Sequence, residues 1–322
     1  MKKMTGIIAM AVLSSAAFAN TIVPETSRDG KTKNSSAIAV TQEMRTFVAG
    51  EYNSATVEPD TTGAEDQDTT NMNVYGGWSN KMISVEADLN MGNYEEGTTD
   101  TDTNTYGVRA AYRINKQFAL GLGYEMEDQD PNTDNTELEI AGSYMMNDLM
   151  IGASFGIVSE DNGTTDGSHN RIILGVGSNA NNMSWEAGLQ FDLEEKDDAV
   201  TSASRTKLFA GATKVVNNIE LDGDLTYTTG DNTVAGGDYT MMTLNLDAEF
   251  LVGKMFYVTP GLNYMDEDQD GTETTKLDLS ADFGYRANKV DATFGIDYAL
   301  SGESSNTDFD RMAWKVNVAY LF

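Results

Sequence analysis

The chain ends with the stretch MAWKVNVAYLF at residues 312–322, and the apolar residues of this stretch occupy alternate positions. Met312, Trp314, Val316, Val318, Tyr320 and Phe322 alternate with Ala313, Lys315, Asn317, Ala319 and Leu321. Successive side chains of a β-strand point to opposite faces, so this pattern predicts a strand with one apolar face. Residues 118–126 and 290–300 show the same period of two, which indicates that such strands recur along the chain.

Short turn-forming segments, most of them containing Asn, separate pairs of these strands. Asn and Gly tolerate the positive φ that tight hairpin turns require. The turns begin at residues 80, 115, 147, 181, 217, 253 and 288, at intervals of 32 to 36 residues. A longer segment rich in Asp, Thr, Gly and Asn lies between each pair of tight turns, including segments 95–105, 160–168 and 229–238, which we expect to be solvated loops. Seven tight turns separate eight hairpins and therefore predict 16 strands.

The strand pattern favours a membrane barrel over three other architectures. Helical tandem repeats would show an apolar period of 3.6, and propeller blades would need about four strands per repeat. A soluble sandwich of 16 strands would be unusually large and regular. Backbone groups in lipid must be satisfied within the protein, so a lipid-facing sheet has to close on itself. We expect an all-β fold, a transmembrane antiparallel β-barrel of 16 strands over residues 45–322, with short periplasmic turns and acidic extracellular loops.

The first residues, MKKMTGIIAMAVLSSAAFAN, are typical of a secretory signal peptide. Lys2 and Lys3 precede an apolar run that is too short to span a membrane as a helix, and Ala17-Phe18-Ala19 forms a cleavage site. We expect residues 1–19 to be the signal peptide. Residues 20–44 are then a leader that precedes the predicted strands. We expect it to be disordered or to form a short helix that carries Val40 and Met44 and extends to Phe47.

The composition argues against nucleic acid as a partner and excludes disulfide bonds. The formal net charge is −30, and without Lys2 and Lys3 the chain keeps 19 of its 21 basic residues against 51 acidic ones. Such acidity argues against nucleic acid as a partner. The chain contains no cysteine, so no disulfide holds it together.

The C-terminal strand resembles the terminal signal of bacterial outer-membrane β-barrel proteins. The residues that carry the resemblance are Trp314, Val316, Val318, Tyr320 and the final Phe322. In that family the signal directs insertion by the barrel-assembly machinery. The resemblance implies a location in the outer membrane, in contact with lipid and lipopolysaccharide.

The strand count is similar to that of the general porins, which are trimeric diffusion channels. This resemblance implies passage of small hydrophilic solutes and ions, and it allows a homotrimer. The chain departs from the general porins because no loop is long enough to fold inward as a constriction, the longest being about 57–70.

The residues opposite the apolar face are rich in charge. Sixteen acidic and eight basic residues occupy inward positions in the predicted register. Those expected to line the pore are Glu86, Asp88, Arg109, Arg113, Glu139, Arg171, Asp192, Asp222, Asp224, Asp247, Asp278, Asp297, Arg311 and Lys315. Together with many inward glycines, they predict a water-filled lumen, and the excess of carboxylates predicts a weak preference for cations.

The alternative interpretation of these charges is that they solvate the inner wall and pair across neighbouring strands. In that case Glu86 and Asp88 would pair with Arg109 and Arg113. Asp291 and Asp297 would likewise pair with Arg311 and Lys315.

The sequence also offers two more specific candidate sites, a calcium loop and a catalytic histidine, and both have weaker support than the pore. Asp266, Asp268 and Asp270 precede Gly271 in the spacing with which a calcium loop begins, but the twelfth position is Leu277 rather than Glu. Loose association of Ca²⁺ or Mg²⁺ with the acidic loops, which include three copies of EDQD at 65–68, 127–130 and 267–270, is the broader expectation. No other cofactor is expected.

His169, the single histidine, follows Ser168 and Asp166, but neighbours in sequence do not make a catalytic triad. The expected function is therefore a porin for passive diffusion of small hydrophilic solutes and not an enzyme. A structural or adhesive surface barrel with acidic extracellular loops is the alternative, and a barrel enzyme is a distant third.

Overall fold

The computed structural model describes most of the chain from residue 46 onward. The described ranges are 46–59, 66–80, 82–129, 133–161, 166–180, 183–193, 196–197, 200–201, 204–217, 219–231, 238–269, 271–287, 289–304 and 307–321. The predicted signal peptide (residues 1–19), the leader (residues 20–44), Asp270 and Phe322 lie outside these ranges.

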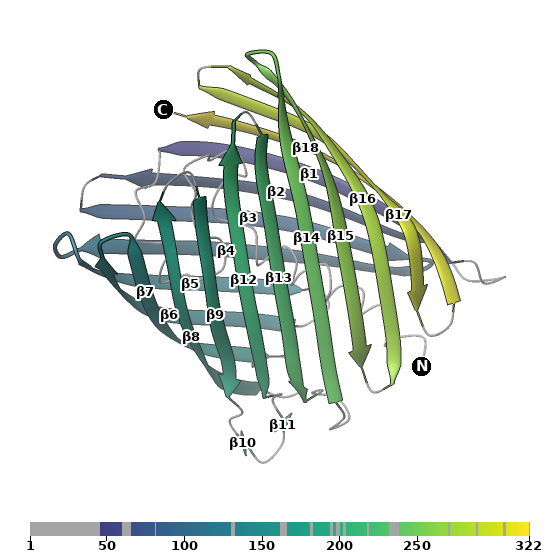
Figure 1. Ribbon diagram of the computed structural model, residues 1–322. Helices are drawn as coiled ribbons and strands as arrows, with labels where there is room; N and C mark the ends of the chain where they lie inside the picture. The colour runs from purple at the N-terminus through teal and green to yellow at the C-terminus, as the bar shows by residue number, and fades with distance from the viewer. Residues whose placement is uncertain are drawn as a thin grey trace.

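Sixteen long strands close into an antiparallel barrel, which confirms the predicted architecture (Figure 1). The barrel strands are β1 (Phe47–Pro59), β2 (Gln67–Ser79), β3 (Ile83–Glu96), β4 (Thr99–Arg113), β5 (Phe118–Gln129), β6 (Thr133–Met146), β7 (Leu149–Asp161), β8 (Asp166–Ala180), β9 (Met183–Leu193), β12 (Arg205–Val216), β13 (Ile219–Asp231), β14 (Asp238–Val252), β15 (Phe256–Gln269), β16 (Thr272–Ala287), β17 (Val290–Ser304) and β18 (Thr307–Leu321). Two short strands, β10 (Lys196–Asp197) and β11 (Val200–Thr201), pair with each other outside the barrel sheet. Among the described residues, no helix is long and apolar enough to cross a membrane.

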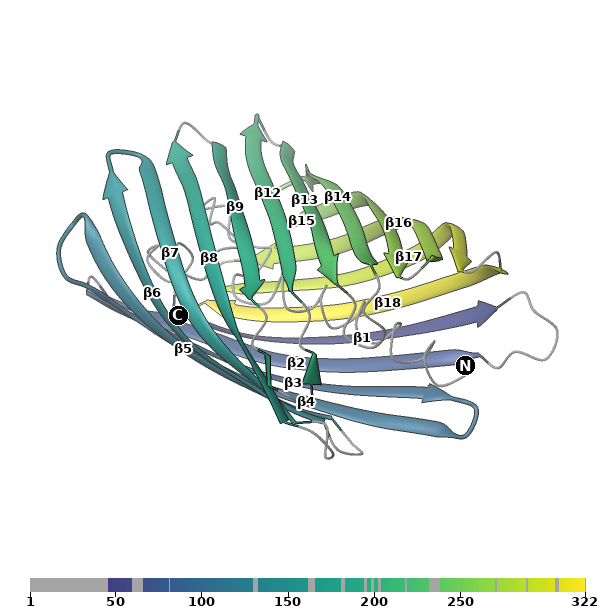
Figure 2. The same cartoon turned by 90° about the horizontal axis from the view of Figure 1, so that it is seen from below.

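The barrel closes where the first strand meets the last. β1 pairs with β18 from Phe47 opposite Leu321 to Pro59 opposite Phe309. Figure 2 shows β1 and β18 running side by side along this seam. Closure leaves no strand of the barrel with an unpaired edge, which is what a sheet in lipid requires.

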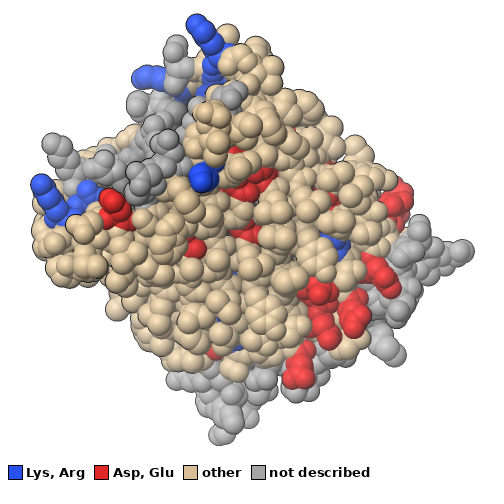
Figure 3. Space-filling model, viewed as in Figure 1, with Lys and Arg blue, Asp and Glu red and all other residues tan. Residues whose placement is uncertain are grey.

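The outer surface is apolar over its middle, as the period of two predicts. In β18 the side chains of Met312, Trp314, Val316, Val318 and Tyr320 are all exposed on the outer face, and Ala313 and Ala319 are buried on the inner face. In the face that Figure 3 shows, most Lys and Arg gather toward the upper left end and most Asp and Glu toward the lower right, with a broad, mostly uncharged region between them. A band of this kind is the surface that a bilayer covers.

The tight turns use the residues that the sequence singles out. Asn147 and Asn217 have φ of 56° and 59°, and Gly253 has φ of 82°. The Asn80 side-chain Oδ1 accepts hydrogen bonds from the backbone N–H groups of Met82 and Ile83, at 2.7 and 2.8 Å. Asn therefore serves these turns in two ways, by adopting left-handed backbone and by capping free N–H groups.

The strands extend further at the other end of the barrel than the sequence predicts. Segment 95–105 is not a solvated loop, because β3 runs to Glu96, β4 begins at Thr99, and only two residues connect them. Alternation of Thr and Asp over 99–105 continues the strand, with Asp100 and Asp102 exposed and Thr101 and Thr105 buried. A polar stretch with this period forms a strand whose outer face lies in water rather than in lipid.

The same extension changes the position of the EDQD copies. Residues 127–129 belong to β5, residues 67–68 to β2 and residues 267–269 to β15, so these parts are strand ends rather than loops. The start of the barrel also differs from one expectation. Phe47 is the first residue of β1 and points to the inner face, so it is not part of a helix.

Candidate functional site: the charged inner wall

The inner face of the barrel holds every residue that was predicted to line the pore. Each lies on the face opposite the exposed apolar side chains and is buried or partly buried. The positions are Glu86 and Asp88 on β3, Arg109 and Arg113 on β4, Glu139 on β6, Arg171 on β8, Asp192 on β9, Asp222 and Asp224 on β13, Asp247 on β14, Asp278 on β16, Asp297 on β17, and Arg311 and Lys315 on β18. Four further charged residues lie on this face: Glu51, Glu127, Glu267 and Arg205. They were not predicted, because they lie near strand ends, where apolar and polar residues no longer alternate clearly in the sequence.

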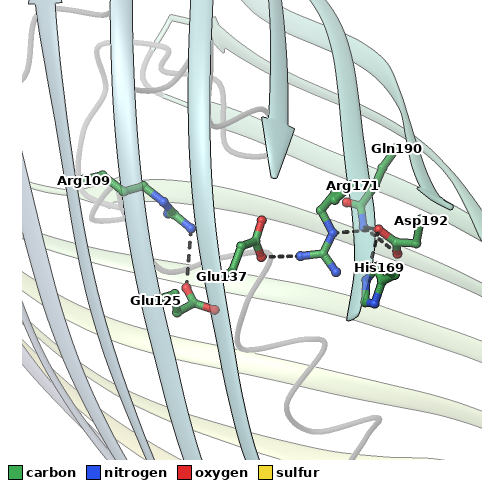
Figure 4. Close-up of polar contacts among 7 residues, drawn as sticks. All are labelled: Arg109, Glu125, Glu137, His169, Arg171, Gln190 and Asp192. Atoms are coloured by element: carbon green, nitrogen blue, oxygen red, sulfur yellow. Dashed lines mark hydrogen bonds and ion pairs between the residues drawn. The ribbon is translucent and has the colours of Figure 1, made fainter. Parts of the chain in front are cut away.

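One group of charged side chains crosses strands β4 to β9, and we call it the β4–β9 belt (Figure 4). It consists of Arg109, Glu125, Glu137, His169, Arg171, Gln190 and Asp192. Arg171 forms an ion pair with Glu137 on one side and contacts Asp192 Oδ1 at 2.7 Å on the other. Gln190 Nε2 donates to Asp192 Oδ2 at 3.1 Å, and Arg109 lies 3.5 Å from Glu125. The guanidinium of Arg171 thus bridges two carboxylates, which its fork geometry favours.

Glycines on the intervening strands let this belt form. Gly156 on β7 lies between Glu137 on β6 and Arg171 on β8, and a Cβ at Gly156 would lie 2.9 Å from Glu137 Oε1. Gly123 on β5 is directly opposite Arg109 on β4 and directly opposite Glu139 on β6. An inward side chain at these positions would separate the charges, so the glycines are part of the site.

A second group of charges lies on strands β14 to β18, and we call it the β14–β18 cluster. Arg286 binds both oxygens of Glu249 at 3.0 Å and also pairs with Asp291. Asp291 accepts a further hydrogen bond from Tyr257 Oη at 2.6 Å, and the Arg286 guanidinium lies over the Tyr257 ring at 4.5 Å. Asp291 is 2 % exposed. Its buried carboxylate is stabilised by one charged donor, Arg286, and one neutral donor, Tyr257.

The remaining members of this cluster pair either within β16 or across β17, from β18 to β16. Arg311 lies 2.9 Å from Asp278, Lys276 lies 2.7 Å from the same carboxylate, and Lys315 lies 3.0 Å from Asp282. The predicted pairing of Asp291 with Arg311 or Lys315 is therefore wrong, whereas Asp297 lies opposite Ala313, between these two basic residues along β18. Asp291 is opposite Ala319, too far along β18 to meet Arg311, and it pairs with Arg286 instead. Glu86 lies directly opposite Arg109, and Arg109 forms an ion pair with Glu125.

Strands β13 and β14 form an acidic wall that adjoins the β14–β18 cluster and shares Glu249 with it. Their inward acidic residues are Glu220, Asp222, Asp224, Asp247 and Glu249, and neither strand contains Lys or Arg. Asp222 is directly opposite Asp247, and Glu220 is directly opposite Glu249. Like charges in opposed positions repel each other, so this wall concentrates negative potential on one side of the inner face.

Several of the inward aspartates lie along the wall rather than toward the barrel axis. Asp88, Asp224, Asp247 and Asp282 are each opposite a glycine on a neighbouring strand, namely Gly107, Gly211, Gly261 and Gly295. A Cβ at any of these glycines would lie 2.1–2.4 Å from a carboxylate oxygen of the aspartate. The carboxylates therefore occupy the space that the missing side chains leave, which keeps them off the axis.

The weaker candidate sites do not assemble into a catalytic or metal site among the described residues. His169 and Ser168 are successive residues of β8 and point to opposite faces, and His169 Nε2 lies 4.0 Å from Asp192 Oδ1. Asp266 and Asp268 are exposed on the outer face of β15, and Asp268 accepts a hydrogen bond from the Gly271 N–H at 2.9 Å. Within the described part of the chain, no group of three or more His, Cys, Asp or Glu side chains is placed to hold a metal ion.

No protein-family model and no curated protein sequence matches the chain. Solved structures do match it in shape. A "Bacterial polysaccharide outer membrane secretin" is 10 % identical, with 87 % of this chain and 100 % of that chain covered and a TM-score of 0.53. The "Anion-selective porin from Comamonas acidovorans" is 12 % identical, with 86 % and 98 % covered and a TM-score of 0.52. A Pseudomonas aeruginosa FadL homologue is 9 % identical, with 94 % and 100 % covered and a TM-score of 0.52.

These similarities establish the fold. The chain is a closed 16-stranded β-barrel, a fold that it shares with outer-membrane porins.

Proposed function

We propose that the protein is an outer-membrane porin, a channel for the passive diffusion of small hydrophilic solutes with a weak preference for cations. The observation that carries this proposal is the contrast between the two faces of one closed sheet. The outer face is apolar over its middle, and the inner face carries charged, polar and small side chains on the same strands. A barrel of 16 strands is wide enough to enclose an aqueous channel, and a lining of this kind is suited to water.

The arrangement of charge supports the preference for cations. The basic residues of the β4–β9 belt and the β14–β18 cluster are held in ion pairs, so each is largely neutralised by its carboxylate partners. The acidic wall of β13 and β14 contributes carboxylates with no Lys or Arg on either strand. Carboxylates that face a pore attract cations and repel anions, which gives selectivity without a narrow filter.

The outer surface supports a location in the bacterial outer membrane. Its apolar band would contact lipid, and the exposed carboxylates at one end, such as Asp100, Asp102 and Asp266, would face lipopolysaccharide and loosely bound Ca²⁺ or Mg²⁺. β18 would present Trp314 to Tyr320 to the barrel-assembly machinery, and a homotrimer is an arrangement that this surface could take. His169 belongs to the β4–β9 belt in this proposal and has no catalytic role.

Liposome swelling tests solute diffusion directly. Proteoliposomes that contain the full chain are diluted into isotonic solutions of sugars of increasing size. Swelling rates that fall steadily with solute size support a general diffusion pore. Liposomes that do not swell with even the smallest sugar, although they hold correctly folded barrel, would overturn the proposal and favour a structural or adhesive role.

A further inference from the structure

Two basic residues on the inner face of β12 differ from the other bases of the inner wall. Arg205 and Lys207 form no ion pair with any carboxylate that the structure describes. Both are partly buried, and Arg205 Nε is buried without a hydrogen-bond partner. Six other inner bases do form ion pairs with described carboxylates: Arg109, Arg171, Lys276, Arg286, Arg311 and Lys315. A partly buried cation without a partner favours the binding of an anion.

The carboxylate that lies opposite Arg205 is already engaged. Asp192 on β9 is directly opposite Arg205 on one side and directly opposite Arg171 on the other. Asp192 Oδ1 contacts Arg171 Nε at 2.7 Å, and Asp192 Oδ2 accepts a hydrogen bond from Gln190 (Figure 4). Because Asp192 binds these two donors, the N–H groups of Arg205 keep their capacity to bind another oxyanion.

Tyr239 and Gly230 fix the position of Arg205. Arg205 on β12 is directly opposite Gly230 on β13, and Gly230 is directly opposite Tyr239 on β14. Since Gly230 has no side chain, the Arg205 guanidinium reaches across β13 and lies over the Tyr239 ring, 4.3 Å from its centroid. The carboxylate of Glu267 on β15 hydrogen-bonds to the Tyr239 hydroxyl. The ring carries no net charge, so it orients the guanidinium without neutralising it.

Lys207 adds a second cation to the same face. It is two residues beyond Arg205 on β12, and inward side chains at this spacing lie about 7 Å apart. Lys207 is directly opposite Gln190 on β9 and Thr228 on β13, and neither of these side chains is charged. An arginine fork beside a lysine ammonium is a donor set that suits carboxylate and phosphate groups.

We propose that Arg205 and Lys207 form a binding site for the oxyanion group of a small solute, a carboxylate or a phosphate. Arg205 is the first residue of β12 and Tyr239 the second residue of β14, so the site lies toward the end of the barrel opposite the tight turns. A solute that enters from this end meets two unpaired cations. The site therefore admits oxyanion-bearing solutes to a pore whose chain has a net charge of −30. The role in transport rests on the proposed pore, whereas binding does not depend on conduction.

Block of the channel current tests the site in a conducting pore. Succinate and inorganic phosphate are added in turn to the full chain in a planar bilayer with KCl, and 1,4-butanediol serves as the uncharged analogue of succinate. We expect at least one of the two anions to reduce the current as its concentration rises, and butanediol to have no effect. Block by succinate alone would assign the site to carboxylates, and block by phosphate alone would assign it to phosphates.

Variants connect this block to the two bases. R205Q/K207Q should raise the half-blocking concentration about tenfold, because it removes charge-assisted hydrogen bonds. The matched control is K116Q/K289Q, which removes the same charge from two tight turns and should be blocked like the full chain. A conducting full chain that neither anion blocks, or an equal half-blocking concentration in R205Q/K207Q, would overturn the site.

Unfolding in the presence of the anions tests binding without conduction. An anion that binds the folded barrel raises the urea concentration at the midpoint of unfolding, measured in detergent at constant ionic strength. We expect this rise in the full chain and in K116Q/K289Q, and its loss in R205Q/K207Q. K207Q alone should lose part of the rise, and it keeps the test available if the double variant does not fold. Equal rises in all variants would overturn the site, whereas a full chain that shows the expected rise but never conducts would instead overturn the proposed pore.

Discussion

Lys315 Nζ lies 3.0 Å from Asp282 Oδ2, although strand β17 separates β18 from β16. Gly295 on β17 is opposite both residues and makes the contact possible. A Cβ at Gly295 would lie 2.2 Å from Asp282 Oδ1 and 2.6 Å from Lys315 Cε. This ion pair of the inner wall thus spans three adjacent strands, with the smallest residue in the middle.

Substitution of the middle residue should therefore break the pair. We expect Gly295→Ala to lower the free energy of unfolding by about 1–3 kcal/mol, because the added methyl group displaces two charged side chains. Urea unfolding of the barrel in lipid, followed by tryptophan fluorescence, measures the change. Gly142→Ala is the control, since its Cβ would meet only Leu120 Cδ2 at 3.7 Å. Equal destabilisation by both variants would show that the cost comes from losing glycine itself.

The acidic wall should set the sign of ion selectivity. D222N/D247N removes two opposed carboxylates, so we expect the permeability ratio of K⁺ to Cl⁻ to move toward one. The effect should be larger in dilute than in concentrated salt, because screening weakens it. Reversal potentials in KCl gradients measure the ratio. D266N/D268N removes the same charge from the outer face and should change it less.

Arg171 should contribute both stability and charge balance to the β4–β9 belt. Arg171→Ala leaves Glu137 and Asp192 without their shared partner, so we expect a loss of about 1–3 kcal/mol in stability and a more cation-selective pore. Arg171→Lys keeps the charge but cannot bridge both carboxylates, so it should preserve selectivity while losing part of the stability. Unfolding and reversal potential are measured on the same preparations. A selectivity change in Arg171→Lys as large as in Arg171→Ala would contradict the charge-balance role.

Turn positions with left-handed backbone should accept glycine without loss of stability, whereas a β-branched residue there should destabilise the barrel. Asn147 has φ of 56°, so Asn147→Val should destabilise the barrel by about 1–2 kcal/mol. Asn147→Gly is the matched variant and should be neutral or nearly so. Fraction folded during refolding into detergent micelles, read from the mobility difference between folded and unfolded chain on unheated gels, measures both. Similar yields for the two variants would mean that backbone conformation at this turn is unimportant.

The sequence predicts those features of the fold that depend on near neighbours. The alternation from Met312 to Phe322 and the Asn-containing turns give the number of strands and the face of each side chain, because period and turn chemistry are local properties. The outer strand ends are harder to predict. Thr99 to Thr105 looks like a polar loop by hydropathy, and it forms a strand because Thr favours extended backbone and its aspartates face water.

The pairing of the inner charges could not be predicted in the same way. It depends on the stagger between strands and on which position faces a glycine on the neighbouring strand, so that a charge two strands away comes within reach, as for Asp282, Gly295 and Lys315. The sequence places Arg311 and Asp278 on the inner face correctly, yet their contact spans β17 and is visible only in the closed barrel.

A planar bilayer that contains the full chain tests the central claim most directly. A water-filled, weakly cation-preferring pore predicts stable ohmic steps of conductance and, in a KCl gradient, a small reversal potential that makes the dilute side positive. Folded barrel that inserts but gives no stable conductance, or a reversal potential of opposite sign, would contradict the account.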